Sequence, residues 1–314
     1  MSVKATVIFQ IDPLRDLNFK TDSTIYILRE AINLGIDVWI CSPKMLSFSD
    51  NKASTWAYRV MDPSFSLSNP VKVSINDFNF FFIRQDPPFD MNYLTNCYLL
   101  ELHAKFNKMP YFVNNPSSIK NFTEKIFPLY YKKIIPKTTI TSNLNEFKKF
   151  LKIYKNLVLK KLYYKGGYGV YKTSISDQNA IDIFKKCSCN STEPIIVQEY
   201  LDKVSNGDKR IILIDGLPKG VINRIPQKGE FKANLHLGGR AEKTVLTAKE
   251  RKICSILEPV LKKNDLFLVG IDIIDEKLTE INVTSPTGLV QINEIEKKDL
   301  SSFIWKKLLK KINL

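Results

Sequence analysis

The strongest constraint on the fold comes from two apolar segments, residues 266–274 and 278–284, that carry charged groups in their middle. Both segments have the pattern of β-strands. Glu280 and Asn282 lie on one face of the second strand, because side chains two residues apart in a strand point the same way. A buried carboxylate costs free energy unless a partner pairs with it. The chain must therefore bring a partner opposite these two side chains.

The short connection between the two segments predicts an antiparallel hairpin. If residues 275–277 form the connection, Asp272 faces Glu280 and Gly270 faces Asn282. A two-residue turn would break this facing. With the facing intact, two carboxylates and an amide converge beside a glycine that leaves room for a ligand. Magnesium ions would satisfy these groups, and an exposed polar strand face is the alternative interpretation.

Composition limits the chemistry of such a site. The chain has 2 histidines and 5 cysteines, and the cysteines have no zinc-type spacing, so a His-rich metal site or Ser-His-Asp catalysis has little material. A metal should be hard and bound by oxygen, which favours Mg²⁺. The net charge of +15 fits nucleic-acid binding or anionic substrates. Because lysines are spread along the chain, a lysine-rich surface is the simpler interpretation.

The order of segments predicts more than one domain. A strand at 3–11, a helix from Asp22 or Ser23 to Leu34 and a strand at 36–42 form an opening typical of a parallel α/β sheet. After about residue 122 the pattern becomes a small α+β unit. The predicted domains are 1–122, 123–201 and 202–314.

The sequence also indicates where the protein works. No apolar run approaches the ~20 residues of a membrane span, and the first residues lack the layout of a signal peptide. We therefore expect no membrane partner and a cytoplasmic location.

Further segments could bind anions. Lys160 lies in a predicted strand, and the loop after it contains Gly166 and Gly167, whose backbone N–H groups could approach phosphates closely. An ordinary hairpin turn explains these glycines equally well. Arg210 and Arg224 lie on two predicted strands of a hairpin and could hold phosphates or carboxylates bidentately. Surface ion pairs are the alternative for these arginines.

Taken in order, these segments resemble the ATP-grasp ligases. More closely, the chain resembles the bacterial-type glutathione synthetases between Asp12 and about Gly288. The matching segments are DPLRDLNFKTDS, RQDPPFD, GDKR, RIPQKGE, GGR, VGIDIID and LTEINVTSPTG. The resemblance implies an α/β fold of the α+β ATP-grasp type: a parallel α/β N-terminal substrate domain followed by a two-lobed ATP-grasp domain.

The sequence departs from that family in its two lid loops, residues 163–169 and 226–240. Tyr163 and Tyr164 occupy positions that are usually Asp-Gly in the first lid. In the second lid, Lys228 replaces a glycine and Lys232 replaces an arginine. Bulkier loops could change the rate of lid closure without changing the chemistry.

The resemblance implies the ATP-dependent ligation of glycine to γ-glutamylcysteine through an acyl phosphate, which gives glutathione, ADP and phosphate. It implies catalytic roles for Arg210 and Arg224, and Mg²⁺ or Mn²⁺ held by Asp272, Glu280 and Asn282. The implied ATP-binding residues are Lys125, Lys160, Gly166, Gly167, Gln198, Glu199, Tyr200, Leu201 and Asp208. The implied substrate-binding residues are Asp12, Asn18, Ser23, Arg84, Asp86, Gly239 and Arg240.

Two other functions compete with this one. A related ATP-grasp ligase could join a different amine to a different carboxylate, although the DPPFD segment argues against it. A catalytically lapsed, basic relative could bind nucleic acid, but the complete metal hairpin and both arginines favour an enzyme without a nucleic-acid partner. The family resemblance also implies a homo-oligomer.

Overall fold

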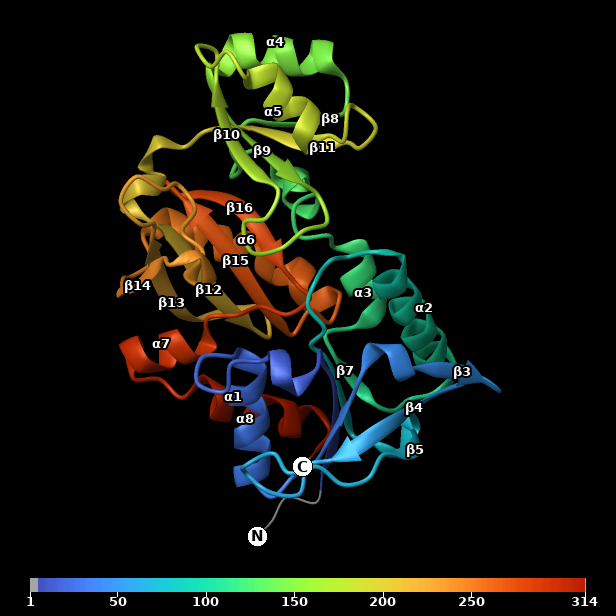
Figure 1. The fold of residues 1–314 in the computed structure, drawn as a ribbon. Coiled ribbons are helices and arrows are strands. Elements are labelled where there is room, and N and C mark those ends of the chain that lie inside the picture. The colour runs from blue at the N-terminus through green and yellow to red at the C-terminus, as the bar shows by residue number, and fades with distance from the viewer. Residues whose placement is uncertain (1–4, 314) are drawn as a thin grey trace.

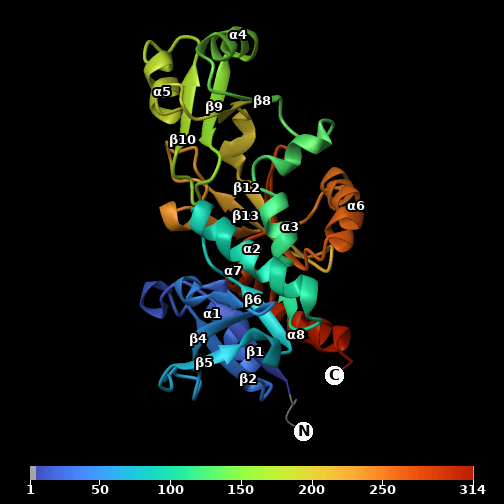
Figure 2. The same ribbon diagram turned by 90° about the vertical axis from the view of Figure 1, so that its right-hand side faces the viewer.

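The computed structural model describes residues 5–313 and contains three β-sheets, one above the other in Figure 1. The first sheet lies in the lower lobe, a five-stranded sheet lies in the middle, and a four-stranded sheet forms the upper lobe. Figure 2, turned by 90°, shows the same three levels, with the upper lobe standing away from the other two. The arrangement leaves the middle sheet in contact with both neighbouring lobes.

The first sheet has a parallel half and an antiparallel half. Its strand order is β3-β4-β2-β1-β6-β7, with β5 paired to β4, and the neighbours β2, β1, β6 and β7 are parallel. The elements of this lobe are β1 (Thr6–Gln10), α1 (Ser23–Asn33), β2 (Asp37–Cys41), β3 (Ser47–Ser49), β4 (Lys52–Arg59), β5 (Val71–Ser74), β6 (Phe80–Ile83), α2 (Met91–Phe106), β7 (Tyr111–Val113) and α3 (Pro116–Asn121). The predicted parallel β-loop-α-β opening is confirmed by β1, α1 and β2.

The upper lobe is a four-stranded sheet, β10-β9-β11-β8, with two helices on it. Phe147 and Phe184 stack at 4.5 Å between their ring centroids and are fully buried, which fixes the helices on the sheet. The elements are β8 (Thr138–Thr141), α4 (Leu144–Tyr154), β9 (Asn156–Lys161), β10 (Val170–Ser174), α5 (Ala180–Cys187) and β11 (Ile195–Glu199).

The middle sheet is antiparallel and has the order β14-β13-β12-β15-β16. One of its faces packs on α6 through buried Ile253, Leu257 and Leu261. The elements from here to the C-terminus are β12 (Asp208–Ile214), β13 (Leu217–Ile225), β14 (Arg240–Lys243), α6 (Ala248–Lys263), β15 (Leu268–Ile274), β16 (Lys277–Asn282), α7 (Leu289–Glu296) and α8 (Leu300–Lys311).

The last helix, α8, returns to the first lobe. Trp305 is fully buried against Phe80 and Phe82, and its indole N–H donates to the carbonyl of Ile27 in α1 at 2.9 Å. The two ends of the chain therefore share one hydrophobic core. The α8 helix packs on a sheet that precedes it by about 200 residues. The predicted domain boundaries stay a prediction.

Candidate active site

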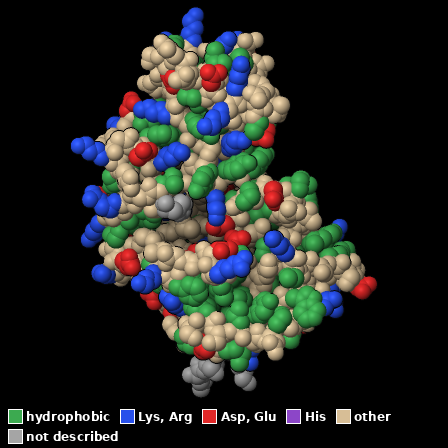
Figure 3. Space-filling model, viewed as in Figure 1, with side chains coloured by type: hydrophobic (Ala, Val, Ile, Leu, Met, Phe, Trp, Pro, Cys, Tyr) green, Lys and Arg blue, Asp and Glu red, His purple; other side chains and the backbone are tan. Residues whose placement is uncertain are grey.

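A cavity of about 940 Å³ lies where the three sheets meet. Figure 3 shows the hollow in the middle of one face, with acidic and basic side chains gathered around it. The middle sheet supplies its floor. The loops after β1 and β6, the hinge after β11 and the loops 163–169 and 226–240 supply its walls. This size is in the range of pockets that hold small ligands.

The hairpin of β15 and β16 places its charged residues as predicted, but by a different route. Asp272 pairs with Glu280 and Gly270 pairs with Asn282. The connection, however, is a two-residue turn, Asp275 and Glu276, both with positive φ. The facing survives because Ile273 pairs with Leu278, which leaves Thr279 as the extra residue of a β-bulge. The prediction of a three-residue connection is therefore wrong, and the bulge corrects the register.

Protein side chains fill the space beside Gly270 that was predicted to leave room for a ligand. A Cβ at this position would lie 3.1 Å from Pro286 and 3.3 Å from the side chain of Arg210. The glycine therefore lets an arginine side chain and a proline pack against the strand.

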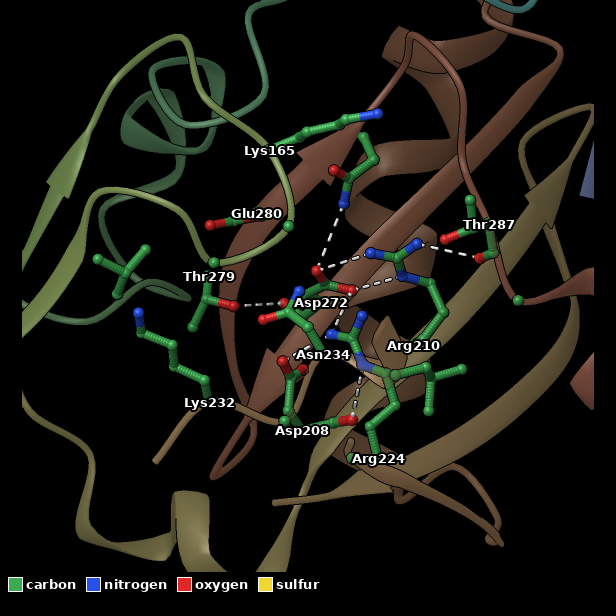
Figure 4. A pocket seen from close by; sticks show the side chains of 18 of the residues that line it. Lys165, Asp208, Arg210, Arg224, Lys232, Asn234, Asp272, Thr279, Glu280 and Thr287 are labelled. Carbon is green, nitrogen blue, oxygen red and sulfur yellow. Dashed lines mark hydrogen bonds and ion pairs between the residues drawn. The ribbon is translucent and has the colours of Figure 1, made fainter. Parts of the chain in front are cut away.

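Four buried charged groups form a network on the floor of the cavity (Figure 4). The guanidinium of Arg210 donates to both carboxylate oxygens of Asp272, at 2.6 and 2.9 Å. The guanidinium of Arg224 lies 2.6 Å from Asp208 and 3.0 Å from Asp272. These side chains are at most 15% exposed. Two cations and two anions thus neutralise each other where water is excluded.

The network shifts the acidities of its members. Burial raises the pKa of Asp272, but the guanidiniums of Arg210 and Arg224 outweigh burial and hold that pKa below its ordinary value. Burial raises the pKa of Asp208, and the negative charge of Asp272 adds to this, although Arg224 opposes both. Asp272 therefore stays ionised, which is the state that binds cations.

Glu280 lies at the edge of this network and is 22% exposed. Its Oε1 is 3.5 Å from Nζ of Lys160, which reaches across from β9 in the upper lobe. The amide nitrogen of Asn282 lies 3.4 Å from Asp272. Glu280 is less constrained than Asp272 and lines the cavity.

All the residues predicted to bind ATP line the cavity. Nζ of Lys125 donates to the carbonyl of Tyr164 at 2.5 Å, so this lysine contacts the first lid loop. In the hinge, Glu199 pairs with Lys277 at 2.6 Å, and the ring of Tyr200 lies under Nζ of Lys172 at 3.8 Å. The cavity-lining members are Lys125, Lys160, Gly166, Gly167, Gln198, Glu199, Tyr200, Leu201 and Asp208.

The residues predicted to bind substrate divide into two groups. Asn18, Asp86, Gly239 and Arg240 line the cavity. The other three, Asp12, Ser23 and Arg84, do not line the cavity. Each of them forms a hydrogen bond with the backbone of a loop that does.

Asp12 accepts from the backbone N–H of Asp86 at 2.9 Å. Ser23 accepts from the N–H groups of Gly288 and Leu289 at 3.2 Å each, and Arg84 donates to the carbonyl of Pro286 at 3.1 Å. None of Asp12, Ser23 and Arg84 lines the cavity, and each holds loop backbone through at least one hydrogen bond, so direct substrate contact by these residues is not supported.

The two lid loops touch each other over the cavity. Gly167 has φ +80°, and a Cβ there would lie 2.9 Å from both Asn234 and Leu237 of the second loop. A larger residue would be strained and would collide, so this glycine permits the contact. Lys232 also lines the cavity, as Figure 4 shows.

Family models cover nearly the whole chain. Residues 5–120 match the N-terminal domain of prokaryotic glutathione synthetase, and residues 124–297 match its ATP-grasp domain. The chain belongs to the prokaryotic glutathione synthetase family. As a member it is an ATP-dependent carboxylate–amine ligase that makes glutathione. The α/β fold with an N-terminal domain and an ATP-grasp domain is thereby confirmed.

Curated relatives match the chain over nearly its whole length. The glutathione synthetase of Agrobacterium fabrum is 39% identical over 311 residues, covering 97% of this chain and 96% of the relative. That of Prochlorococcus marinus subsp. pastoris is 38% identical over 304 residues, covering 96% and 98%.

Solved structures support the fold of this glutathione synthetase family member. D-cycloserine synthetase is similar with a TM-score of 0.69 at 12% identity, covering 96% of this chain and 99% of the other. D-alanyl-alanine synthetase A from Vibrio cholerae has a TM-score of 0.61 at 15% identity, covering 99% and 98%. None of the described helices is both long and apolar enough to cross a membrane.

The structure adds site residues that the sequence did not predict. Glu124 lines the cavity and accepts from the hydroxyl of Thr284 at 2.7 Å. Burial raises the pKa of Glu124, and Lys125 opposes the shift. Lys165 and Thr279 also line the cavity. The position of Glu124 next to Lys125 could have indicated this residue from the sequence. Thr279 could be identified only from the bulge.

Proposed function

We propose that the cavity binds ATP with Mg²⁺ on the β15–β16 hairpin and joins γ-glutamylcysteine to glycine there. The observation that supports this most is the pairing of Asp272 with Glu280 beside two buried arginines. An accessible carboxylate and a fixed pair of guanidiniums on one sheet suit a reaction that moves a highly charged phosphoryl group.

The donor set fits Mg²⁺ bound together with a nucleotide. Asp272, Glu280 and Asn282 offer oxygen atoms from one hairpin, and a carboxylate that accepts from guanidinium retains further lone pairs. Among the described residues, no group of three or more His, Cys, Asp and Glu side chains could hold a metal alone. The two carboxylates and one amide of the hairpin agree with Mg²⁺, which is usually bound by one or two carboxylates together with phosphate oxygens. When bound, the ion would neutralise charge on the ATP phosphates.

Arg210 and Arg224 act on the phosphoryl group and on the acyl phosphate. The cysteinyl carboxylate of the dipeptide attacks the γ-phosphorus of ATP, ADP leaves, and an acyl phosphate forms. The glycine amine, after losing a proton, attacks the acyl carbon and phosphate leaves. Guanidiniums fixed before the reaction stabilise the developing charge without reorganisation. Their fixed position comes from Asp208 and Asp272, which hold them in ion pairs.

The remaining walls bind the nucleotide and exclude water. Gln198, Glu199, Tyr200 and Leu201 take the purine along the hinge, and Lys125 and Lys160 take phosphates with the loop of Gly166 and Gly167. Asp208 acts indirectly by holding Arg224. The lids 163–169 and 226–240 cover the acyl phosphate, which water would otherwise hydrolyse. Asn18, Asp86, Gly239 and Arg240 face the substrates.

We also infer a homo-oligomer that works in the cytoplasm. Met91, Tyr98, Leu102 and Phe106 are exposed on α2, which is an apolar surface available for a second copy. The 5 cysteines are free, as expected in a reducing compartment. Light scattering of the purified protein tests the first inference, and a monomer at micromolar concentration would contradict it.

A substrate panel tests the function. With ATP, Mg²⁺ and glycine, γ-glutamylcysteine should release ADP far faster than free glutamate or α-linked dipeptides do. Equal rates across the panel would overturn the choice of dipeptide while leaving an ATP-grasp ligase. Omitting glycine provides the control, because complete turnover needs the amine.

A further inference from the structure

An ion pair joins the first lid to the first lobe across the cavity. Lys165 lies in the loop 163–169, and its Nζ contacts Oδ2 of Asp86, which follows β6. Both residues line the cavity, and their side chains are 47% and 33% exposed. A ligand in the cavity can therefore reach both charges.

The backbone on each side of the pair is held by specific contacts. The N–H of Phe89 donates to the carbonyl of Tyr163 at 3.1 Å, and the N–H of Tyr168 donates to the carbonyl of Lys165 at 3.1 Å. The N–H of Asp86 donates to Asp12 at 2.9 Å. These hydrogen bonds hold the two loops so that Lys165 and Asp86 face each other.

Charges of both signs gather at this end of the cavity. Asp16 pairs with Arg15 at 3.8 Å, and the charge of Asp86 acts on Arg84 as well as on Asp12. Burial raises the pKa of Asp12, the charges of Asp86 and Asp16 raise it further, and the charge of Lys165 lowers it. Asp86 and Lys165 are thus one anion and one cation in a charged part of the cavity, which suits a ligand that carries both charges.

We propose that Asp86 and Lys165 together bind the free α-amino-acid end of the γ-glutamyl group, which determines specificity for a γ-linked dipeptide. Asp86 takes the α-ammonium and Lys165 takes the α-carboxylate. A γ-linked glutamyl residue carries both charges on one carbon, whereas an α-linked residue has used that carboxylate in its peptide bond. This assignment rests on the proposed use of γ-glutamylcysteine.

The pair is suited to such an exchange. A partly exposed ion pair contributes little net stability, so the ligand's own two charges can replace it at small cost. The ammonium of Lys165 and the carboxylate of Asp86 are in direct contact. A zwitterion whose two charged groups share one carbon is compact enough to meet both of them. The lid would then close with the ligand's charges bridging it to the first lobe in place of the direct contact.

Three peptides test the two charge contacts one at a time in an assay of ADP release at saturating ATP, Mg²⁺ and glycine. They are γ-glutamylcysteine, glutarylcysteine, which lacks the α-ammonium, and 4-aminobutanoylcysteine, which lacks the α-carboxylate. Where turnover of an analogue is too slow to follow, its inhibition constant against γ-glutamylcysteine replaces KM. The variants are Lys165→Met and Asp86→Asn, and Lys165→Arg keeps the positive charge.

Each variant should lose one charge contact and no other. Lys165→Met should raise the KM for γ-glutamylcysteine about tenfold or more, since an ionic hydrogen bond is lost, and should leave 4-aminobutanoylcysteine unchanged. Asp86→Asn should raise the same KM and leave glutarylcysteine unchanged. Lys165→Arg should retain most of the affinity. Lys149→Met, which breaks an exposed pair with Glu146 outside the cavity, is the matched control without effect.

Other results overturn the assignment. An equal rise in KM for all three peptides would give the pair a structural role in the lid. A rise in the KM for glycine would assign the site to that zwitterion, and unchanged constants would remove the pair from recognition. If the unmodified protein releases no ADP with γ-glutamylcysteine, the proposed function fails first and this assignment falls with it.

Discussion

On the floor of the cavity, Asp208, Arg210, Arg224 and Asp272 pair with one another and are at most 15% exposed. On the first lid, Tyr163, Tyr164 and Tyr168 are 46–69% exposed, and the loop touches the first lobe through the pair of Lys165 with Asp86 and one backbone hydrogen bond. The floor is fixed before any ligand arrives, whereas the lid is held by contacts that a ligand can exchange. Charge stabilisation therefore belongs to the floor, and selection and water exclusion belong to the lid.

The largest effect should follow from Arg210→Met on the floor. The substitution leaves Asp272 buried without its bidentate partner, so we expect a loss of about 3–5 kcal/mol in the free energy of unfolding. Turnover should fall about a thousandfold, because a fixed donor to the transferring group is lost. Urea denaturation and ADP release measure the two effects.

The control for Arg210→Met is Arg59→Met. Arg59 pairs with Asp37 at 2.7 Å, but its side chain is 51% exposed, so its loss should cost less than about 1 kcal/mol. A cost for Arg210→Met as small as for Arg59→Met would mean that the floor is not the fixed region described above.

A smaller effect, confined to activity, is expected for Glu280→Gln. This change keeps the shape but removes the accessible negative charge, so Mg²⁺ binding should weaken and turnover should fall about a hundredfold or more. Stability should change little, because the contact with Lys160 is long, at 3.5 Å. Activity within about threefold at limiting Mg²⁺, with unchanged metal affinity, would contradict a metal role.

Much of this floor could be predicted from sequence, because strand alternation and an apolar pattern place Asp272, Glu280 and Asn282 on one face. The bulge at Thr279 could not be predicted, because a two-residue turn with a bulge and a three-residue turn produce the same facing. The packing of Arg210 beside Gly270 could not be predicted either, because Arg210 comes from a strand about 60 residues away in the sequence.

The walls were less predictable than the floor. Asp12, Ser23 and Arg84 lie in the segments that matched the family, but a segment match does not say which way a side chain turns. Each of them holds loop backbone, as the bond of Arg84 to the carbonyl of Pro286 illustrates. Lys165 pairs with a residue 79 positions away, which no local pattern reports.

The lids should respond to ligand while the floor does not. With nucleotide and dipeptide bound, amide hydrogen exchange in residues 163–169 and 226–240 should slow about tenfold or more, because closure removes the open states through which these amides exchange. Amides of β15 should change little, since they are already paired on both sides. Unchanged protection in both lids would count against closure and would remove the contrast between lid and floor.

The smallest effect is expected for Thr279→Val, at the bulge that aligns the floor. The hydroxyl of Thr279 donates to the carbonyl of Asp272 at 3.1 Å, and the residue is 7% exposed. Valine has the same shape, so the loss of one hydrogen bond should cost about 1 kcal/mol of stability. Thr95→Val is a control, because that hydroxyl donates to the carbonyl of Met91 on the exposed face of α2 and should cost less.

The activity of Thr279→Val tests what holds the register of the hairpin. Leu278 and Ile281 are fully buried on the face that packs against α6, so a slip by one residue would expose them and turn Glu280 away from the cavity. If this packing fixes the bulge, Thr279→Val keeps turnover within about threefold of the unmodified protein. If the hydroxyl fixes it, turnover falls as far as in Glu280→Gln, and the floor would owe its alignment to a single hydrogen bond.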